Sequence, residues 1–226
     1  MTGEINEASM TKRKWRDEDV ASVALAEVAS PRLAITKQFF TVHRLDEEPV
    51  ACVRFDSDRW WVYARLKDEP YFWVSIVKRQ ADGLAATWGF SLAYANLYLA
   101  VSSVDLTSRE ITAMLGLRPH KTRQKGDLIG AGPKRYQEHL WTYRPSLPEP
   151  LGFEMKLAHL LRELSSRSEQ LRLMQKSCDM SVSVAYYDYA GSPSGWHLDL
   201  EMLKGLFSLN LEIDVDLYVS GPELPD

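Results

Sequence analysis

Tyr94-Ala-Asn-Leu-Tyr-Leu-Ala-Val101 and, soon after it, Leu106-Thr-Ser-Arg-Glu-Ile111 are the stretch of sequence that decides the fold. The first segment is aromatic, aliphatic or small and has no proline, which is typical of a β-strand. Thr107 and Glu110 have the spacing of a capping box, in which each side chain bonds the other residue's backbone amide at the start of a helix. Gly116 ends this helix, because glycine tolerates the left-handed conformation found there. The stretch therefore predicts a strand followed by a clearly bounded helix.

The same order of signals returns near residue 200. Asp199 is in position to cap a helix and Asn210 to stop it, and a strand follows. In that strand Leu211, Ile213, Val215, Leu217 and Val219 alternate with Glu212, Asp214, Asp216 and Tyr218. A period of two places the apolar residues on a core and the acids on the other face. Neighbouring acids on one strand face can help to hold a hard cation, but the solvated face of a half-buried strand is the favoured interpretation.

Several of these segments together resemble a known bacterial family. The strand at 94–101, the segment 105–119, Lys125-Gly-Asp127, the strand at Trp141, a leucine-rich helix and the closing 213–218 strand are similar to the domain of unknown function family DUF4279. The resemblance covers a little over half the chain and leaves out the first ninety or so residues. The family has no established catalytic residues, so none can be transferred. Some relatives are associated with toxin and defence loci, and the resemblance therefore implies a partner-binding protein.

Composition sets the class of protein. The chain has 226 residues, 45% of them hydrophobic, and a formal net charge of −4. The acidic balance argues against general affinity for nucleic acid. The start of the chain lacks the apolar core of a secretory signal, and no apolar run approaches the length of about 20 residues that spans a bilayer. We therefore expect a cytoplasmic protein without a membrane partner, in which Cys52 and Cys178 are buried thiols.

The remaining patterns predict an α+β protein. A helix is indicated over residues 15–30. Strand-like runs follow at 33–43, 50–55, 59–66 and 71–78, and their Asp- and Pro-rich connections predict an antiparallel meander. Later segments predict a mixed unit with helices layered on a sheet, including a strand at 140–143, an amphipathic helix at 153–164 and a strand at 180–189. The expected organisation is a disordered tail (1–14), a helix plus meander (15–88), the DUF4279-like domain (89–220) and a short tail (221–226).

The first candidate surface is aromatic. Trp61, Tyr63 and Arg65 share one face of a strand. If the next strand pairs with it as a hairpin, Tyr71 and Trp73 can join them in one patch beside Arg54. Aromatic residues with arginine are typical of protein-binding hot spots, and the rings can also stack on single-stranded bases. The alternative, which has equal weight, is that this face is interdomain core.

The second candidate surface is a basic, glycine-bearing loop. Its cations, which are anion or nucleic-acid candidates, are Lys121, Arg123, Lys125, Lys134 and Arg135. Glycines let a backbone approach a phosphate and the cations supply charge. The loop is not a P-loop, however, because the glycine spacing before a Lys-Ser/Thr pair is missing, and Pro133 removes one amide donor. A solvated loop is the favoured interpretation.

The sequence has no complete motif for catalysis or metal binding. The segment Gly191-Ser-Pro-Ser-Gly195 has the glycines of a nucleophile elbow, but its central residue is Pro193. Cys178 has no local signature, and the five histidines lack zinc-ligand spacing. We therefore expect no catalytic residues, no metal and no cofactor.

The leading hypothesis is a non-enzymatic cytosolic factor that binds another protein. Its narrower form is an immunity or defence-associated protein that masks its partner. The alternative is a nucleic-acid or nucleotide-binding module that uses the basic loop and the aromatic face. A third hypothesis is a hydrolase centred on Cys178 or on the acidic strand.

Overall fold

The computed structural model describes residues 15–225, which divide into two units. The first comprises residues 15–92 together with 221–225, and the second is Ala93–Ser220. The expected disordered tail, residues 1–14, lies outside the described residues. The division falls after Leu92, whereas the sequence indicated residue 88, because a strand continues through that position.

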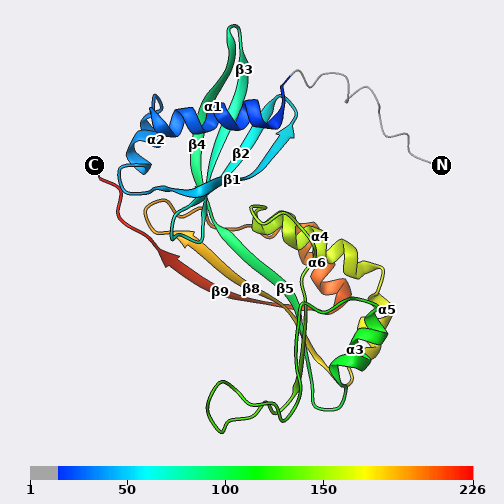
Figure 1. Ribbon diagram of the computed structural model, residues 1–226. Helices are drawn as coiled ribbons and strands as arrows, with labels where there is room; N and C mark the ends of the chain where they lie inside the picture. Colours follow the sequence, from blue (N-terminus) through cyan, green and yellow to red (C-terminus); the bar gives the residue numbers. More distant parts are fainter. Residues whose placement is uncertain (1–14, 226) are drawn as a thin grey trace, which may run out of the picture. The chain divides into compact units, whose positions relative to one another are not determined.

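The first unit is a meander with helices, as expected. Its elements are α1 (Asp17–Ala29), α2 (Ala34–Phe39), β1 (Leu45–Asp56), β2 (Arg59–Leu66), β3 (Phe72–Gln80) and β4 (Gly83–Leu92). The strands lie in the order β1-β2-β3-β4, and each pairs antiparallel with the next (Figure 1). Val20, Ala21 and Ala24 of α1 form a core cluster with Trp60, Val62 and Val77 of the sheet. One face of the meander is therefore covered by α1.

One expected strand of this unit is wrong. Residues 33–43 contain the short helix α2, and the fourth strand of the meander is β4. The buried Glu27 explains the difference, because its Oε1 accepts hydrogen bonds from the backbone amides of Arg32 (2.9 Å) and Leu33 (2.8 Å). The carboxylate thus satisfies backbone donors at the start of α2, which overrides the strand preference of the local sequence.

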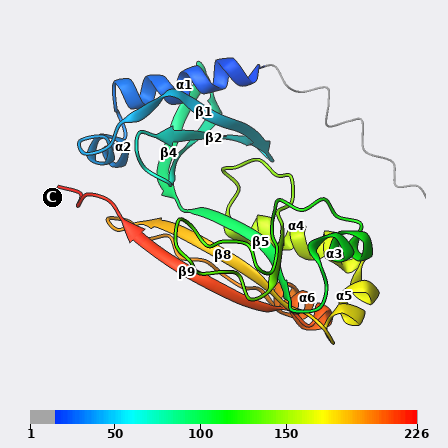
Figure 2. The same cartoon turned by 60° about the horizontal axis from the view of Figure 1, so that its bottom comes forward.

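The second unit is a five-stranded mixed sheet with four helices. Its elements are β5 (Tyr94–Ser103), α3 (Ser108–Leu115), β6 (Lys121–Arg123), β7 (His139–Tyr143), α4 (Phe153–Ser165), α5 (Ser168–Met174), β8 (Asp179–Tyr189), α6 (Leu200–Leu209) and β9 (Glu212–Ser220). The strand order is β6-β7-β5-β8-β9, and only the β8–β9 pair is parallel. Figure 2 shows β5, β8 and β9 side by side. The α+β class is thereby confirmed.

The helix boundaries of this unit follow the predicted signals. Thr107 Oγ1 accepts from the Glu110 amide at 3.3 Å, and Glu110 Oε2 accepts from the Thr107 amide at 2.8 Å, so the capping box forms. Gly116 ends α3 in the left-handed conformation with φ of 63°. Asp199 caps α6 by accepting from the Met202 amide at 2.8 Å, and Asn210, with φ of 50°, ends it.

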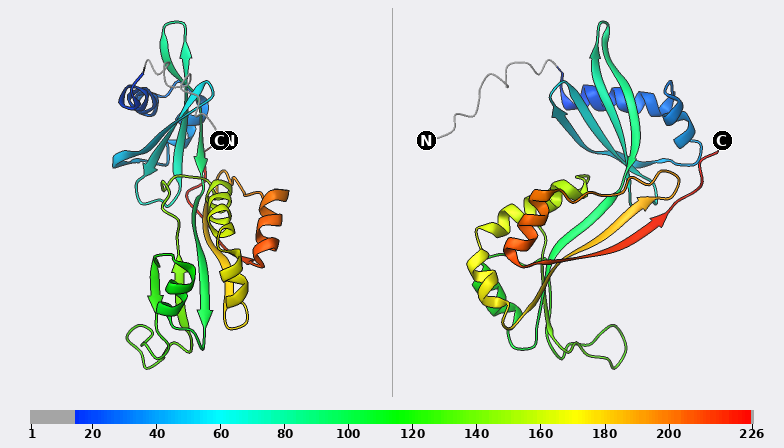
Figure 3. Two further views of the ribbon diagram at one scale, coloured as in Figure 1. Left: turned by 90° about the vertical axis from the view of Figure 1, so that its right-hand side faces the viewer. Right: turned by 180° about the vertical axis from the view of Figure 1, so that it is seen from behind.

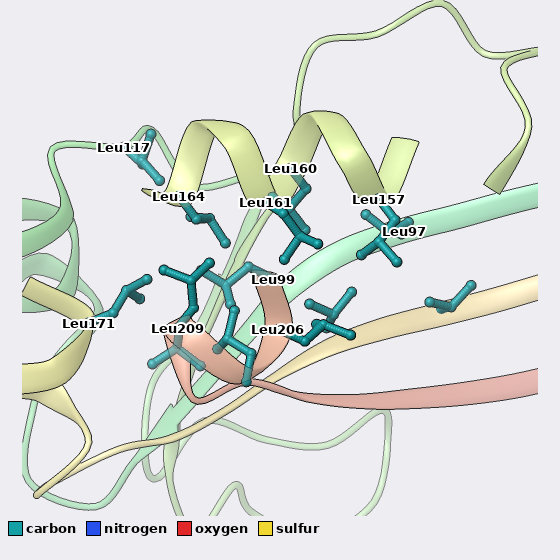
Figure 4. Close-up of a cluster of buried hydrophobic side chains, with 14 of the residues drawn as sticks. Leu97, Leu99, Leu117, Leu157, Leu160, Leu161, Leu164, Leu171, Leu206 and Leu209 are labelled. Atoms are coloured by element: carbon teal, nitrogen blue, oxygen red, sulfur yellow. The ribbon is translucent and has the colours of Figure 1, made fainter. Parts of the chain in front are cut away.

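The hydrophobic core of this unit lies between its helices and one face of its sheet. Figure 4 shows leucines of α4, α5 and α6 pointing toward Leu97 and Leu99 of β5. Trp141 of β7 is fully buried in the same cluster, and its Nε1 donates to Thr112 Oγ1 of α3 at 2.9 Å. Residues of all four helices belong to this one cluster. Among residues 15–225, no helix combines the length and apolar character needed to cross a bilayer.

Candidate functional site

The strands of the 93–220 unit have a second face, opposite the helices. Side chains on a strand alternate between faces. Leu97, Leu99 and Val101 are buried toward the helices, so Tyr98, Ala100 and the other even-numbered residues of β5 point the other way. They are only half-buried. We call this surface the open face. In the described part of this unit, α3 to α6 all contribute to the core on the opposite side, and a helix residue reaches the open face at its end, where Lys156 of α4 contacts Tyr94.

The sheet register aligns small residues across the open face. Thr142 of β7 pairs with Ala100, and Ala100 pairs with Ser181 of β8. In the next row, Tyr98 pairs with Ser183. Directly opposed residues on neighbouring strands lie on the same face of a sheet. The centre of the open face is therefore floored by hydroxyl and methyl groups, with Tyr98 as its one large side chain in these two rows.

This floor is hollowed. A hollow of about 720 Å³ runs over the middle of the sheet and around the end of β8. On the open face its lining includes Tyr98, Ala100, Ser102, Thr142, Ser181 and Ser183. A second hollow of about 340 Å³ shares Tyr98, Leu140 and Thr142 with the first and extends to Lys121, Arg123 and Tyr136. Together they form a trough with a polar floor, shaped to receive protruding side chains rather than an enclosed apolar ligand.

Opposite charges stand at the two ends of this trough. Lys121 pairs with Thr142 at one edge of the sheet, and Glu212 pairs with Ser181 at the other. With a strand spacing of about 4.8 Å, four spacings separate Lys121 from Glu212 by about 19 Å. Arg123 accompanies the lysine, Asp214 and Asp216 accompany the glutamate, and all five side chains are exposed. The trough thus presents a positive edge and a negative edge to anything that lies across it.

One end of the open face carries a row of tyrosines. Tyr94 pairs with Tyr187 of β8, which pairs with Tyr218 of β9. The rings of Tyr94 and Tyr187 stack with centroids 5.9 Å apart, and those of Tyr187 and Tyr218 with centroids 4.8 Å apart. Tyrosine offers a rigid ring and a polar hydroxyl, which suits protein interfaces.

The expected basic loop continues β6 and β7 as a hydrogen-bonded arm, visible at the foot of the right-hand view in Figure 3. The Gly126 amide donates to the Tyr136 carbonyl at 2.8 Å, and the Ile129 amide donates to the Lys134 carbonyl at 2.8 Å. Arg135 is partly committed to this arm, since its guanidinium donates to the Gly126 carbonyl at 2.6 Å. The five cations predicted as anion ligands, Lys121, Arg123, Lys125, Lys134 and Arg135, are all exposed. The first two lie at the edge of the open face, and the other three lie on the arm.

The expected aromatic patch is divided by the register of the meander. Trp61 pairs with Ile76 and Tyr63 with Val74, whereas Trp73 pairs with Ala64. Trp73 and Tyr71 therefore lie on the opposite face from Trp61 and Tyr63, and the expectation of one patch is wrong.

Trp73 is buried beside α2, and its ring stacks on Phe39 with centroids 4.5 Å apart. Tyr71 is buried as well. Arg54 pairs with Trp61 and shares its face, as does Arg65 by strand alternation. Tyr63 on that face is buried, and burial raises the pKa of its hydroxyl. Four of the six predicted residues thus share a face, and Tyr71 and Trp73 belong to the core on the other side.

The groups considered for catalysis lie in different environments. Cys178 is buried, and burial raises the pKa of its thiol, which keeps it protonated at neutral pH. Asp214 is exposed on the open face. Among residues 15–225, no three His, Cys, Asp or Glu side chains converge as a metal ion would require. What the open face offers chemically is hydrogen bonding, stacking and charge.

Residues 93–220 match the family model described as Domain of unknown function (DUF4279), which is more than half of the chain. The chain belongs to this family. The matched DUF4279 segment coincides with the unit that carries the open face. The resemblance seen in the sequence is thereby confirmed. No curated protein matches the chain, and no solved structure does.

The sequence patterns did not predict the open face of the DUF4279 unit, apart from its acidic and basic ends. Strand alternation in residues 94–103 does signal two different faces, with leucine on one and Asn96, Tyr98 and Ser102 on the other. That signal does not say which strands are neighbours. The central row exists only because β5 lies between β7 and β8.

Proposed function

We propose that this protein binds another protein through the open face of its DUF4279 unit and has no catalytic role. The observation that carries the proposal is the hollowed sheet face, whose centre is not covered by the described helices of its own unit, with a positive edge at Lys121 and a negative edge at Glu212. A sheet needs only one buried face, and the second face of a largely antiparallel sheet is commonly solvated, so the hollow and the opposed charges support the proposal rather than exposure alone. The polar floor suits a partner that is itself a folded, water-soluble surface.

The shape of the trough favours a polypeptide over a small ligand. Small-molecule sites enclose most of their ligand and are lined mainly by apolar and aromatic groups. Here the floor is largely Ser, Thr and Ala, and the charges lie about 19 Å apart across five strands. A partner surface is large enough to contact both edges at once. Such charge complementarity would contribute mainly to association rate and specificity. The narrower proposal, an immunity or defence-associated factor that masks its partner, follows if the partner's own working surface docks here.

The test compares two tryptophan variants of tagged, full-length protein. Ser183→Trp fills the floor of the trough, and Ala113→Trp places the same side chain on the exposed side of α3, which packs on the other face of the sheet. Proteins captured from the native host are identified by mass spectrometry, purified and titrated against each variant.

We expect a direct partner to bind the wild type and Ala113→Trp equally and to bind Ser183→Trp at least about tenfold more weakly, because one side chain then occupies the interface centre. Equal binding by both variants would remove the open face from the proposal.

The alternative function is nucleic-acid binding by the arm and the positive edge. It is favoured by the exposure of all five cations between Lys121 and Arg135. Its test is fluorescence anisotropy with a labelled single-stranded oligonucleotide at increasing salt. Binding that weakens steeply with salt, and that is weaker and less salt-dependent in Lys125→Glu, would support it, because the variant loses a phosphate contact. Affinity that does not depend on salt would exclude it.

A further inference from the structure

Strand β9 forms a free edge of the second sheet. The strand order ends at β9, and no other strand among residues 15–225 pairs with its outer side. All nine of its residues pair in an unbroken register from Ser181↔Glu212 to Tyr189↔Ser220, so the strand is regular to its end. Its last five residues are all exposed. Long regular edges invite pairing with another strand, because they present unpaired backbone donors and acceptors.

The hydrogen bonds identify which backbone groups of β9 point outward. The Ser220 carbonyl accepts from the Ala190 amide at 2.9 Å, and Ser220 is the register partner of Tyr189. In a parallel pair, a residue whose carbonyl is bonded in this way turns its amide to the same neighbour, and residues two apart repeat the pattern. Even-numbered residues of β9 therefore bond β8. The amides and carbonyls of Ile213, Val215, Leu217 and Val219 point to the free edge.

The side chains of β9 add charge to one side of this edge and apolar surface to the other. Glu212, Asp214 and Asp216 are exposed on the open face. Leu217 (59% exposed) and Val219 (52% exposed) lie on the helix side, where they extend the row begun by Ile213 and Val215. Pairing with a second copy in antiparallel orientation would set acids against acids, which is unfavourable. The edge is therefore complementary to a strand that carries cations on one face and apolar residues on the other.

Helix α6 supplies an apolar cover beside this edge. Its residues Leu200, Leu203 and Phe207 are 64%, 47% and 87% exposed. Gly205 contacts α4, since a Cβ there would lie 3.0 Å from Leu161 Cδ1. Residues two apart on a helix point in nearly opposite directions, so Leu203 and Phe207 point away from α4.

Because α4 packs near β5 and the sheet continues through β8 to β9, the side away from α4 is the side toward the free edge. Phe207 also lines the same hollow as Glu212 at the start of β9.

We propose that β9 accepts an extended segment of the partner protein by strand addition, with Lys or Arg at alternate positions facing Glu212, Asp214 and Asp216. The intervening apolar residues of that segment pack beneath Leu203 and Phe207 of α6. Strand addition takes its affinity from main-chain hydrogen bonds and its specificity from alternate side chains. This inference rests on the proposed function and names the chemistry of the partner.

The first experiment uses a synthetic peptide of four Lys-Val repeats and, as a control, one of four Glu-Val repeats. The full-length protein is titrated with each, and amide hydrogen exchange is measured with and without peptide. We expect the Lys-Val peptide to bind, to slow exchange in β9 and to weaken with salt, because ion pairs at an exposed edge are screened. No binding, or binding without protection of β9, would overturn the proposal.

Two variants of one position separate backbone pairing from side-chain contact. Leu217→Pro removes an outward amide, whereas Leu217→Thr keeps it, and both remove the same apolar side chain. Proline is tolerated on an edge strand where its nitrogen faces solvent. We expect Leu217→Pro to bind the Lys-Val peptide about tenfold more weakly than Leu217→Thr, the effect of one lost hydrogen bond and its distortion of the edge. Equal affinities would contradict strand addition.

A third variant covers the case in which Leu217→Pro does not fold. Phe207→Ser changes an almost fully exposed side chain, and we expect it to reduce peptide affinity severalfold through lost apolar contact. Unchanged affinity would show that α6 takes no part. The native partner then distinguishes the two proposals. If the partner no longer binds Ser183→Trp but still binds Leu217→Pro, binding through the open face is supported and strand addition is refuted. If the partner still binds both variants, both proposals are refuted.

Discussion

Lys156 of α4 gives the sharpest quantitative prediction, because it is a buried cation. Its Nζ donates to the Ala95 carbonyl at 2.7 Å and lies 4.8 Å from the centroid of the Tyr94 ring. Burial, and secondly the nearby charge of Arg144, lower its pKa from 10.5 to about 8, while Glu149 acts in the opposite direction. The folded state therefore binds this proton less tightly than the unfolded state does.

The change is Lys156→Met, which keeps the length of the side chain and removes the charge. Below pH 8 both states hold the proton, and the folded state bears the full cost of burying it. Between pH 8 and 10.5 the unfolded state binds more protons, so the stability of the wild type rises with pH. Linkage between these two pKa values gives a rise of about 2.5 kcal/mol from pH 7 to pH 10 that the methionine variant lacks.

The assay is urea unfolding of both proteins, followed by circular dichroism, at several pH values from 7 to 10. The difference between the two free energies of unfolding cancels contributions from other titrating groups. Lys176→Met, which removes an exposed lysine, controls for the loss of one positive charge. Free-energy curves of the wild type and Lys156→Met that stay parallel across this range would refute the reasoning, since they would mean that Lys156 is as well solvated in the folded state as in the unfolded one.

Three further predictions concern packing, capping and thiol chemistry. Gly89→Ala should destabilise the meander by about 1–3 kcal/mol in thermal unfolding, because the new Cβ would lie 2.2 Å from a carbon of the Trp73 ring; an unchanged melting temperature would contradict this. Thr107→Ala should cost about 1 kcal/mol in urea unfolding and Thr107→Ser much less, because serine keeps the capping oxygen; equal losses would argue against the cap. Iodoacetamide should modify the half-buried Cys52 before the buried Cys178 in the native protein and both alike in denaturant; faster reaction at Cys178 would support the hydrolase hypothesis.

The parts of the fold that were predictable are those specified by neighbours in the sequence. The capping box at Thr107 and Glu110 involves residues three apart, and the alternation in β9 involves residues two apart. Such signals survive in the structure because the interactions that cause them are local. The meander was predictable for the same reason, since each of its strands pairs with the next.

The errors arose where a residue distant in the sequence, or one on a neighbouring strand, determines the local secondary structure. Residues 33–43 have the branched and aromatic composition of a strand, yet the Glu27 carboxylate caps a helix there. The strand from Gly83 to Leu92 was missed because glycines usually indicate turns. Gly89 instead lies within the strand, where the Trp73 ring leaves no room for a Cβ.

The aromatic patch failed by one residue of register, because a shift of one places every side chain on the opposite face. The open face requires the strand order, which the sequence does not state.

The strand order also implies that the two units acquire their structure at different speeds. In the meander each strand pairs with the strand next to it in the chain, so hairpins can form as soon as both halves exist. In the second unit the central strand β5 pairs with β7 and β8, and Leu99 meets Tyr143 and Val182 across dozens of intervening residues. Long loops must close before these contacts form, which slows folding. The apolar face of β5 is therefore buried late in folding. The chain is most prone to aggregation in the interval before β8 pairs with β5.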